Sequence, residues 1–403
     1  MIWRVAAPHP KTRAQIPPSK EPKYLTEKGA RMKTKPNKVR YAVVGLGHLA
    51  QVAVLPAFKQ ARNSELAALI SSEPKKLTKL SEQYKVSKTY SYDQYEECLR
   101  SSIDAVYIVL PNHLHREFTV RALKAGIHVL CEKPMAPTTK DCQAMIDSAR
   151  KHNCKLMIAY RLHFEKANLE AIDIVRRGKL GEPRFFSSDF AQQVVKDNVR
   201  VTEPVSKGGG PIYDMGIYCI NAARYLFAAE PTEVSATSAT IRESRFRDTE
   251  EMTAVTMRFP GERLATFTAS FGAADIGRYT VIGTKGTLTA DPGYEYAEGI
   301  NLETKVSGRS KKQTFAKRDQ FAAELVYFSD CILRNKKPEP SGEEGLADVR
   351  IIEAIYKSSR TGKVVKLARS TKKDRPQLDQ EIRRPAHEKP ATVEVESPSG
   401  EAA

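Results

Sequence analysis

The sequence predicts an α/β protein in which a doubly wound parallel sheet is followed by an α+β domain with an open, mainly antiparallel sheet. As far as residue 160, short apolar runs alternate with helical stretches, which is typical of successive βαβ units. Between residues 232 and 314, longer alternating runs are joined by short turns. A chain of 403 residues exceeds one ordinary domain and is long enough for two.

The chain begins with a basic leader, residues 1–38, that is rich in Pro and Lys and has no apolar periodicity, so we expect it to be disordered. Residues 1–39 carry ten Lys or Arg and two Glu, and so supply nearly half of the net charge of +17. The leader shows neither an apolar signal core nor a twin-arginine pair, which favours a cytoplasmic over a periplasmic protein. Met32 is an alternative start, so expression of residues 1–31 stays open.

Residues 39–162 are predicted to form the first domain. Its buried parallel strands are the apolar runs at 39–47, 66–72, 104–111, 128–133 and 155–160. Its helices are expected near 48–61, 74–84, 91–100, 115–125 and 138–152. Thr138 and Asp141 form a capping-box pattern at the start of the last helix. This alternation predicts right-handed crossovers and one parallel sheet.

Residues 163–370 are predicted to form the second domain. Its helices are expected near 165–179, from the glycine run as far as Tyr225, near 318–335 and near 343–362. Its strands are expected at 184–190, 232–241, 251–260, 263–272 and 279–290. The polar, Pro-containing tail at 371–403 is expected to be disordered.

The composition excludes several classes of protein. No apolar run reaches the roughly 18 residues that a membrane span needs. The single Trp and the aromatic content of 8% give no stacking platform for nucleic acid. The six cysteines show neither paired spacing nor a Cys/His cluster, so we predict no metal site and a reducing compartment. The remaining positive charge favours anionic ligands, a phosphorylated cofactor included.

A glycine-containing turn, Gly45-x-Gly47-x-x-Ala50, lies between the first strand and the first helix. Gly45 permits a tight turn, Gly47 lets the backbone approach a pyrophosphate, and Ala50 allows close helix–strand packing. The helix N-terminus adds free N–H groups and a positive dipole end. We therefore predict a dinucleotide site that includes His48 and Leu49 of the same turn; an ordinary glycine turn is the alternative.

The residues after the second strand favour one dinucleotide over another. NAD sites usually carry an acid roughly 20 residues after the glycines, where it binds the ribose 2′-hydroxyl. Ser71 stands at that position, followed by Ser72, and a hydroxyl accommodates a 2′-phosphate that a carboxylate would repel. Lys75 and Lys76 can supply positive charge. The sequence therefore predicts NADP rather than NAD, unless the lysines are merely solvated.

Lys133 ends the strand HVLCEK, and ligands of doubly wound sheets bind outside such strand ends. An ammonium group there can stabilise a developing alkoxide or the charge state of a neighbouring group. Glu132 precedes it and also lies at the strand end. A surface lysine paired with Glu132 is the alternative.

Asp214 and Tyr218 are four residues apart and would share one face of a helix. The glycines at 208–210 allow the backbone to approach a ligand closely at the entry to this helix. Tyr218 can accept a proton if a cation stabilises its phenolate, and Asp214 can orient the substrate. A half-buried tyrosine on an ordinary amphipathic helix is the alternative.

Four further residues lie at strand ends on the same side of the predicted sheet. Pro111 and Asn112 end the third strand and are candidates for the nicotinamide ribose. His115 follows them and either binds the cofactor or simply opens a helix. Arg161 follows the last strand of the first domain and contacts cofactor or substrate, or pairs with Glu165.

On these motifs the chain resembles the glucose–fructose oxidoreductase / inositol dehydrogenase / rhizopine-catabolism family over roughly residues 38–368. The pieces that carry the resemblance are YAVVGLG, DAVYIVLPNHLH, HVLCEKPMA, LMIAYRLHF, GGGPIYDMGIY and GEEGLADVRIIEAIYKSSRTG. The resemblance implies a Rossmann domain followed by a substrate-binding and oligomerisation domain. It also implies that Lys133, Asp214 and Tyr218 are catalytic. With Tyr at position 218 the chain resembles the glucose–fructose oxidoreductase branch, whose members use NADP.

The resemblance implies an NADP-dependent sugar oxidoreductase that moves a hydride between pyranose C1 and the nicotinamide. An ordinary sugar or inositol dehydrogenase that releases its cofactor, and a dinucleotide-binding regulator without turnover, are the alternatives. The expected partners are a sugar or cyclic polyol and further copies of the chain, as a homodimer or homotetramer. The segment 191–207 does not match the branch, so the sugar is not named by the sequence.

Overall fold

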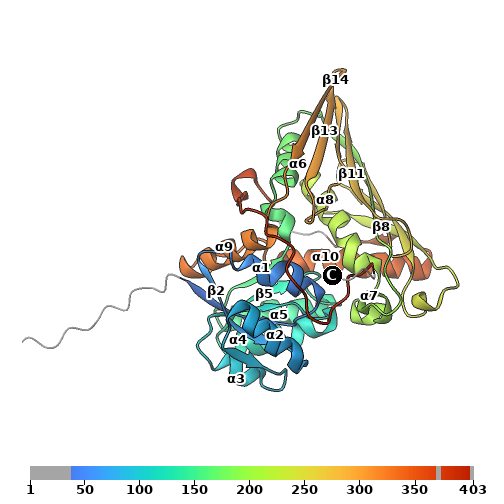
Figure 1. The fold of residues 1–403 in the computed structure, drawn as a ribbon. Helices are drawn as coiled ribbons and strands as arrows, with labels where there is room; N and C mark the ends of the chain where they lie inside the picture. Colours follow the sequence, from blue (N-terminus) through green and yellow to red (C-terminus); the bar gives the residue numbers. More distant parts are fainter. Residues whose placement is uncertain (1–37, 369–373, 400–403) are drawn as a thin grey trace, which may run out of the picture. The chain divides into compact units, whose positions relative to one another are not determined.

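The computed structural model of the chain describes residues 38–368 and 374–399. Apart from Lys38, the predicted leader lies outside the described residues. A parallel sheet of six strands and a mixed, mostly antiparallel sheet of nine strands organise the described part of the chain (Figure 1). The predicted fold class is therefore confirmed.

The six-stranded sheet has the order β3-β2-β1-β4-β5-β6, and all its pairings are parallel. Its strands are β1 Val39–Val44, β2 Ser64–Ile70, β3 Lys88–Tyr90, β4 Ala105–Ile108, β5 His128–Glu132 and β6 Leu156–Ala159. The sequence missed β3, because a three-residue edge strand carries no apolar periodicity. The strand order reverses between β1 and β4, and ligands of such sheets bind at that point.

Helices link these strands: η1 Ala50–Val54 continued by α1 Leu55–Ala57, α2 Pro74–Tyr84, α3 Tyr95–Leu99, α4 His115–Lys124 and α5 Thr139–Lys151. The helix after β1 begins as a π-helix, η1, which is common at functional sites. The hydroxyl of Thr138 accepts a hydrogen bond from the Asp141 N–H at 3.1 Å, as the capping pattern predicts.

The nine-stranded sheet has the order β14-β13-β12-β11-β7-β10-β9-β8-β15. Its strands are β7 Pro183–Ala191, β8 Glu233–Ala239, β9 Met252–Phe259, β10 Arg263–Ser270, β11 Ile276–Gly283, β12 Gly286–Ala290, β13 Ile300–Val306, β14 Arg309–Phe315 and β15 Val365–Lys366. Only β7 and β10 pair in parallel. The bounds of the β13–β14 hairpin were not predicted, since β14 is mostly polar and exposed.

Helices cover one face of this sheet: α6 Lys166–Arg176 contacts β13, α8 Ile217–Leu226 contacts β7, and α10 Gly342–Thr361 contacts β8. The core-facing side chains of β10, such as Ala265 and Phe267, are buried against them. On the other face Phe185 and Leu264, which are neighbours in β7 and β10, are 42% and 41% exposed. The sheet is therefore open on one side.

The end of the chain returns to the six-stranded sheet. Helix α9, Gln320–Leu333, packs on β1 and β2, with Ser329 hydrogen-bonded to Tyr41 and Ser64. The tail was expected to be disordered, but residues 374–399 differ from this expectation. Val393 in this segment is buried and exchanges two hydrogen bonds with Gln51. Irregular backbone can be ordered by such side-chain contacts, which leave no periodic signal in the sequence.

Candidate active site

The turn after β1 has the shape that a pyrophosphate requires. Gly45 has a φ of +96°, and a Cβ at this position would lie 2.3 Å from the carbonyl oxygen of Val109. A Cβ at Gly47 would meet no atom within 4 Å, so Gly47 faces open space. The Gln51 N–H donates to the Gly47 carbonyl at 3.2 Å, so η1 begins directly at the turn. Free space thus lies in front of a helix N-terminus, which fits a dinucleotide phosphate group.

A groove of about 360 Å³ extends from this turn past the ends of β4 and β5. Most of the predicted cofactor-binding and catalytic residues line it: Gly45, Gly47, His48, Leu49, Ala50, Ser71, Lys76, Pro111, Asn112, Glu132, Lys133 and Asp214. Among the lining residues that were not singled out from the sequence, three are charged: Glu73, Arg200 and Glu203. The groove therefore joins the glycine turn to the predicted catalytic residues.

Three of the predicted cofactor residues do not line this groove. Ser72 is exposed to solvent beyond it. His115 is fully buried, and its ring nitrogens lie 2.8 and 2.9 Å from the carbonyl oxygens of Leu110 and Pro134. Arg161 points into a neighbouring cleft instead. Strand-end position identified the correct edge of the sheet but not the direction of each side chain.

The end of the groove at Ser71 carries an acidic residue, Glu73, as well as a basic one, Lys76. The Ser71 hydroxyl accepts a hydrogen bond from the Glu73 N–H at 3.2 Å. The Lys76 ammonium lies 2.6 Å from the Glu73 carboxylate. A ribose phosphate bound beside Ser71 would compete with Glu73 for Lys76.

Lys133 is fixed by Asp214. Its ammonium donates to the Asp214 carbonyl at 2.8 Å and to the Asp214 carboxylate at 3.0 Å. Asp214 lies in the π-helix η5, Ile212–Gly216, directly before α8. Burial, the largest influence, lowers the pKa of Lys133, but the negative charge of Asp214 and the phenol of Tyr218 raise it above the usual value overall. Lys133 is therefore held as a cation.

Arg200 is the second cation at Asp214 and was missed from the sequence. Its guanidinium lies 3.1 Å from the second carboxylate oxygen of Asp214. Burial raises the pKa of Asp214, yet Arg200 and then Lys133 lower it below the usual value overall. With both oxygens engaged, Asp214 orients Lys133. Arg200 comes from α7, Val199–Thr202, inside the segment 191–207.

Tyr218 lies between two cations but is hydrogen-bonded to only one of them. The Lys133 ammonium lies 4.8 Å from the centre of the Tyr218 ring. The Arg161 Nε donates to the Tyr218 hydroxyl at 3.1 Å. The other guanidinium nitrogens of Arg161 donate to Gln320 and to the carbonyls of Tyr294 and Glu295. Arg161, which was expected to contact cofactor or substrate or to pair with Glu165, holds the Tyr218 hydroxyl in place.

A buried pair of carboxyl groups lies behind Lys133. The Tyr107 hydroxyl is 2.8 Å from Glu132 and 3.4 Å from Glu324, and one O–H cannot donate to both. Burial, followed by the charge of Glu132, raises the pKa of Glu324 well above the usual value. Burial also raises the pKa of Glu132, but the charge of Lys133 opposes this. Of the two carboxyl groups, Glu324 is the one whose neutral form is favoured more strongly.

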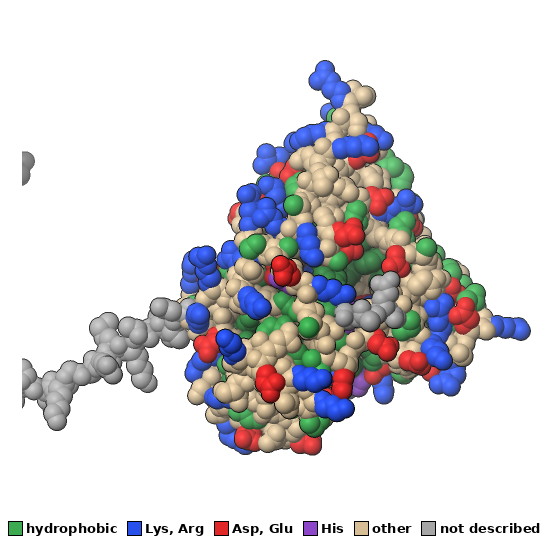
Figure 2. All heavy atoms as spheres, viewed as in Figure 1, with side chains coloured by type: hydrophobic (Ala, Val, Ile, Leu, Met, Phe, Trp, Pro, Cys, Tyr) green, Lys and Arg blue, Asp and Glu red, His purple; other side chains and the backbone are tan. Residues whose placement is uncertain are grey.

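A cleft of about 730 Å³ adjoins the groove and shares Lys133, Asp214 and Glu132 with it. Tyr218, Arg161, Tyr294 and Tyr296 line the cleft. Figure 2 shows a hollow on this face, with hydrophobic side chains inside it and both basic and acidic side chains around its rim. A polyhydroxylated ligand would find aromatic faces and paired charges there, directly beside the catalytic candidates.

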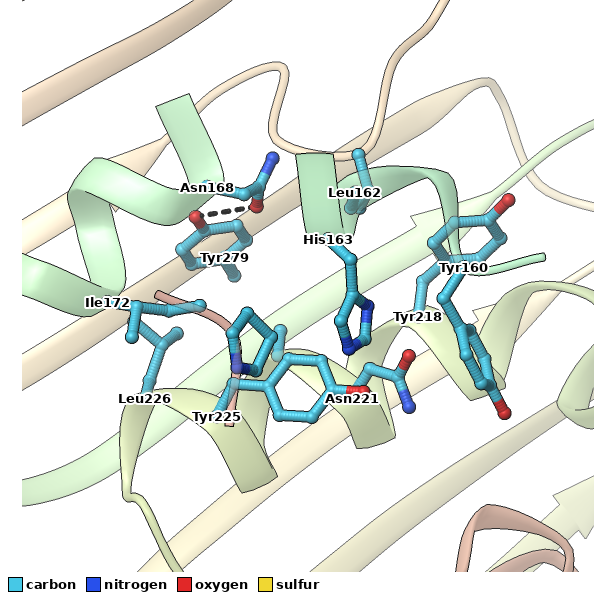
Figure 3. Close-up of a pocket in the computed structure, with 12 residues that line it drawn as sticks. Tyr160, Leu162, His163, Asn168, Ile172, Tyr218, Asn221, Tyr225, Leu226 and Tyr279 are labelled. Atoms are coloured by element: carbon cyan, nitrogen blue, oxygen red, sulfur yellow. Dashed lines mark hydrogen bonds between the residues drawn. The ribbon is translucent and has the colours of Figure 1, made fainter. Parts of the chain in front are cut away.

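Tyr218 also borders a smaller cavity of about 30 Å³ behind the cleft. Figure 3 shows Tyr218 and Asn221 from α8 facing His163 and Tyr160, which follow β6. The space is about that of one water molecule. This cavity is too small for a sugar, so a sugar beside Tyr218 would have to lie in the cleft.

Neither a metal centre nor a membrane segment is found in the part of the chain that the structure describes. Within residues 38–368 and 374–399, no group of three or more His, Cys, Asp or Glu could hold a metal ion. No helix in the same residues is long and apolar enough to cross a membrane.

Comparison with known families gives two matches. Residues 39–160 match the GFO_IDH_MocA oxidoreductase family, described by its NAD-binding Rossmann fold. Residues 168–289 match the GFO/IDH/MocA C-terminal domain. Together these matches span most of the two sheets described above.

Individual relatives agree with this result. A D-xylose 1-dehydrogenase [NADP(+)] of Haloarcula marismortui is 32% identical over 338 residues, which are 82% of this chain and 94% of that protein. A D-xylose 1-dehydrogenase (NADP(+)) of Haloferax volcanii is 30% identical over 81% of this chain and 99% of that protein. The crystal structure of aldose-aldose oxidoreductase from Caulobacter crescentus, complexed with glycerol, has a TM-score of 0.78 and 39% identity, covering 82% of this chain and 100% of that one.

Proposed function

The chain belongs to the GFO/IDH/MocA oxidoreductase family, and we propose from this premise that it moves a hydride between C1 of a pyranose and NADP at the junction of the groove and the cleft. It is an NADP-dependent oxidoreductase that acts on the hydroxyl groups of sugars. The single observation that carries the proposal is the joint position of Lys133 and Asp214, which line both cavities.

NADP, when bound, supplies the hydride acceptor or donor; the other tasks belong to residues of this chain. Tyr218, acting in its deprotonated form, takes the proton of the sugar hydroxyl as the carbonyl forms. The Lys133 cation stabilises the negative charge that develops on that oxygen. Asp214 holds Lys133, and Arg161 holds the Tyr218 hydroxyl toward the cleft. In the reverse direction Tyr218 returns the proton.

The proposal is tested by incubating the protein with NADP and a panel of aldoses and cyclic polyols, while cofactor reduction is followed by absorbance. We expect turnover with at least one aldose, with the lactone as product. A protein that binds NADP but reduces it with no member of the panel would contradict the proposal. Turnover with cyclic polyols alone would point to ring carbinols other than C1.

We further propose that copies of the chain associate through the open face of the nine-stranded sheet, as a homodimer or homotetramer. Phe185 and Leu264 are exposed side by side on this face among Ser and Thr side chains. We also propose a cytoplasmic location, in keeping with the six cysteines, which are all free thiols.

A further inference from the structure

The C-terminal segment crosses the cofactor site. We name residues 386–399 the C-terminal strap; it is the dark-red end of the ribbon, which passes α1 and ends near α7 (Figure 1). His387, Lys389, Ser397 and Pro398 of the strap line the cleft, and Pro398 also lines the groove. Neither family match extends to this part of the chain.

The strap is bound to the glycine turn through one buried amide. The Gln51 side chain donates to the Val393 carbonyl at 3.0 Å and accepts from the Val393 N–H at 2.7 Å. The same side chain donates to the carbonyl of Leu46, between the two glycines of the turn, at 2.9 Å. Gln51 is 1% exposed, so loss of these partners would leave a buried amide unsatisfied. Docking of the strap and the conformation of the turn are thereby coupled.

Two further contacts fix the strap on opposite sides of the site. His387 lies 3.0 Å from the Val52 carbonyl in η1 and 2.9 Å from the carboxylate of Asp319, which caps α9. Near the end of the chain, the Pro398 carbonyl accepts a hydrogen bond from the Val195 N–H at 2.9 Å, beside β7 of the second sheet. The strap therefore reaches from the helix at the glycine turn to the wall of the other domain.

The strap also brings positive charge to the glycine turn. Burial lowers the pKa of His48, and the charges of Arg200 and Lys389 lower it further. Arg200 comes from α7 and Lys389 from the strap, and both line the cleft together with His48. Two cations from outside the six-stranded sheet thus converge on the residues that face the dinucleotide phosphates.

We propose that the C-terminal strap is part of the dinucleotide-binding site, in which Lys389 neutralises phosphate charge and the backbone from Val393 to Pro398 slows cofactor release. The inference rests on the proposed function and deepens it. Since the strap is bonded to both walls, a bound dinucleotide leaves only after these contacts open. Slow release of the cofactor would make the chain an oxidoreductase that keeps its cofactor between substrates, and not a dehydrogenase that releases it at each turnover.

The test uses two chains, one ending at Pro385 and a control ending at Ser399, with NADPH as the probe. Dissociation is followed by the loss of NADPH fluorescence after mixing with excess NADP, and the melting temperature is recorded for both. We expect the dissociation rate to rise at least about tenfold in the shorter chain, the equivalent of about 1.4 kcal/mol. Equal rates in the two chains would overturn the inference and leave the proposed function intact, whereas failure of both chains to bind NADPH would refute the proposed function as well.

A single substitution covers the case in which the shorter chain does not fold. Lys389 is exposed, so Lys389→Gln removes charge without disturbing a core. We expect weaker NADPH binding at low salt and a smaller dependence of the dissociation constant on salt concentration. Glu388→Gln, the adjacent change of opposite charge, is the control and should not weaken binding. Identical salt dependence in the wild type and Lys389→Gln would overturn the role of Lys389.

Discussion

The Tyr218 hydroxyl accepts a hydrogen bond from the Arg161 Nε at 3.1 Å, although Arg161 lies just after β6 and Tyr218 lies in α8, 57 positions further along the chain. Lys133 faces the ring of Tyr218 and donates its hydrogen bonds to Asp214. The cation that holds the phenol is thus separate from the cation that we propose to face the substrate oxygen. The first three predictions rest on these separate roles of Arg161 and Lys133.

Tyr218→Phe removes the proposed proton acceptor and keeps the ring. General acid–base catalysis contributes about 10²–10⁴-fold, so kcat should fall by a factor in that range. The ring still packs against Phe190 and Tyr294, so the melting temperature should change little. Steady-state kinetics and thermal denaturation measure the two effects. A variant with wild-type kcat would show that the proton leaves by another route.

Arg161→Lys keeps the charge but loses the planar fork that spans four partners. Lysine cannot reach Tyr218, Gln320 and the Tyr294 carbonyl together. We expect kcat to fall by on the order of 10²-fold through misplacement of Tyr218. We also expect a stability loss of about 1–3 kcal/mol from unsatisfied buried groups. If NADPH affinity fell instead while kcat stayed normal, Arg161 would belong to the cofactor site after all.

Lys133→Ala should lower turnover far more than cofactor affinity. The ammonium faces Asp214 and Tyr218 at the inner end of the groove, away from the glycine turn. Loss of one group that stabilises developing charge costs roughly 10²–10³-fold in kcat. Fluorescence titration with NADPH should give an affinity close to that of the wild type. Lys207→Ala, at an exposed lysine before the glycine run, is the control for lost charge.

Ser71→Asp should weaken NADP binding and leave NAD binding almost unchanged. Ser71 lines the groove beside Lys76, and a second carboxylate there would repel a 2′-phosphate. We expect a loss of NADP affinity of about 10–100-fold, equivalent to about 1.4–2.8 kcal/mol. Ser72→Asp places the same charge on the adjacent exposed residue and is the matched control. Equal effects of the two substitutions would argue against a specific role for Ser71.

Release of NADPH should become faster as the pH rises beyond the usual pKa of a histidine. The hydrogen bond to Asp319 raises the pKa of His387 above its usual value, with burial and the charge of Lys317 opposing the shift. Both ring nitrogens face acceptors, so the imidazolium makes both bonds. For a raised pKa the stabilisation is complete below the usual pKa and is lost as the pH passes the folded-state value. His387→Gln should abolish the pH dependence of the dissociation rate between pH 6 and 9; an unchanged profile would remove His387 from this role.

Local patterns in the sequence identified most of the first domain and the candidates at its strand ends. Apolar runs gave five of the six parallel strands, and the spacing of Gly45 and Gly47 gave the phosphate turn. The direction of the side chains at those strand ends was harder to predict. His115 turned inward to two backbone carbonyls because burial of an imidazole requires satisfied nitrogens.

The sequence by itself determined the fold class, the phosphate turn, Lys133 at a strand end and the pairing of Asp214 with Tyr218 on one helix, because each depends on residues close together in the chain. The tertiary structure alone decided that Arg161 holds Tyr218, that Arg200 shares Asp214 with Lys133, and that Val393 binds Gln51 across 342 positions. These contacts join segments that have no common periodicity. The free energy of these contacts depends on three-dimensional proximity and burial, and neither can be predicted from residues that are neighbours in the sequence.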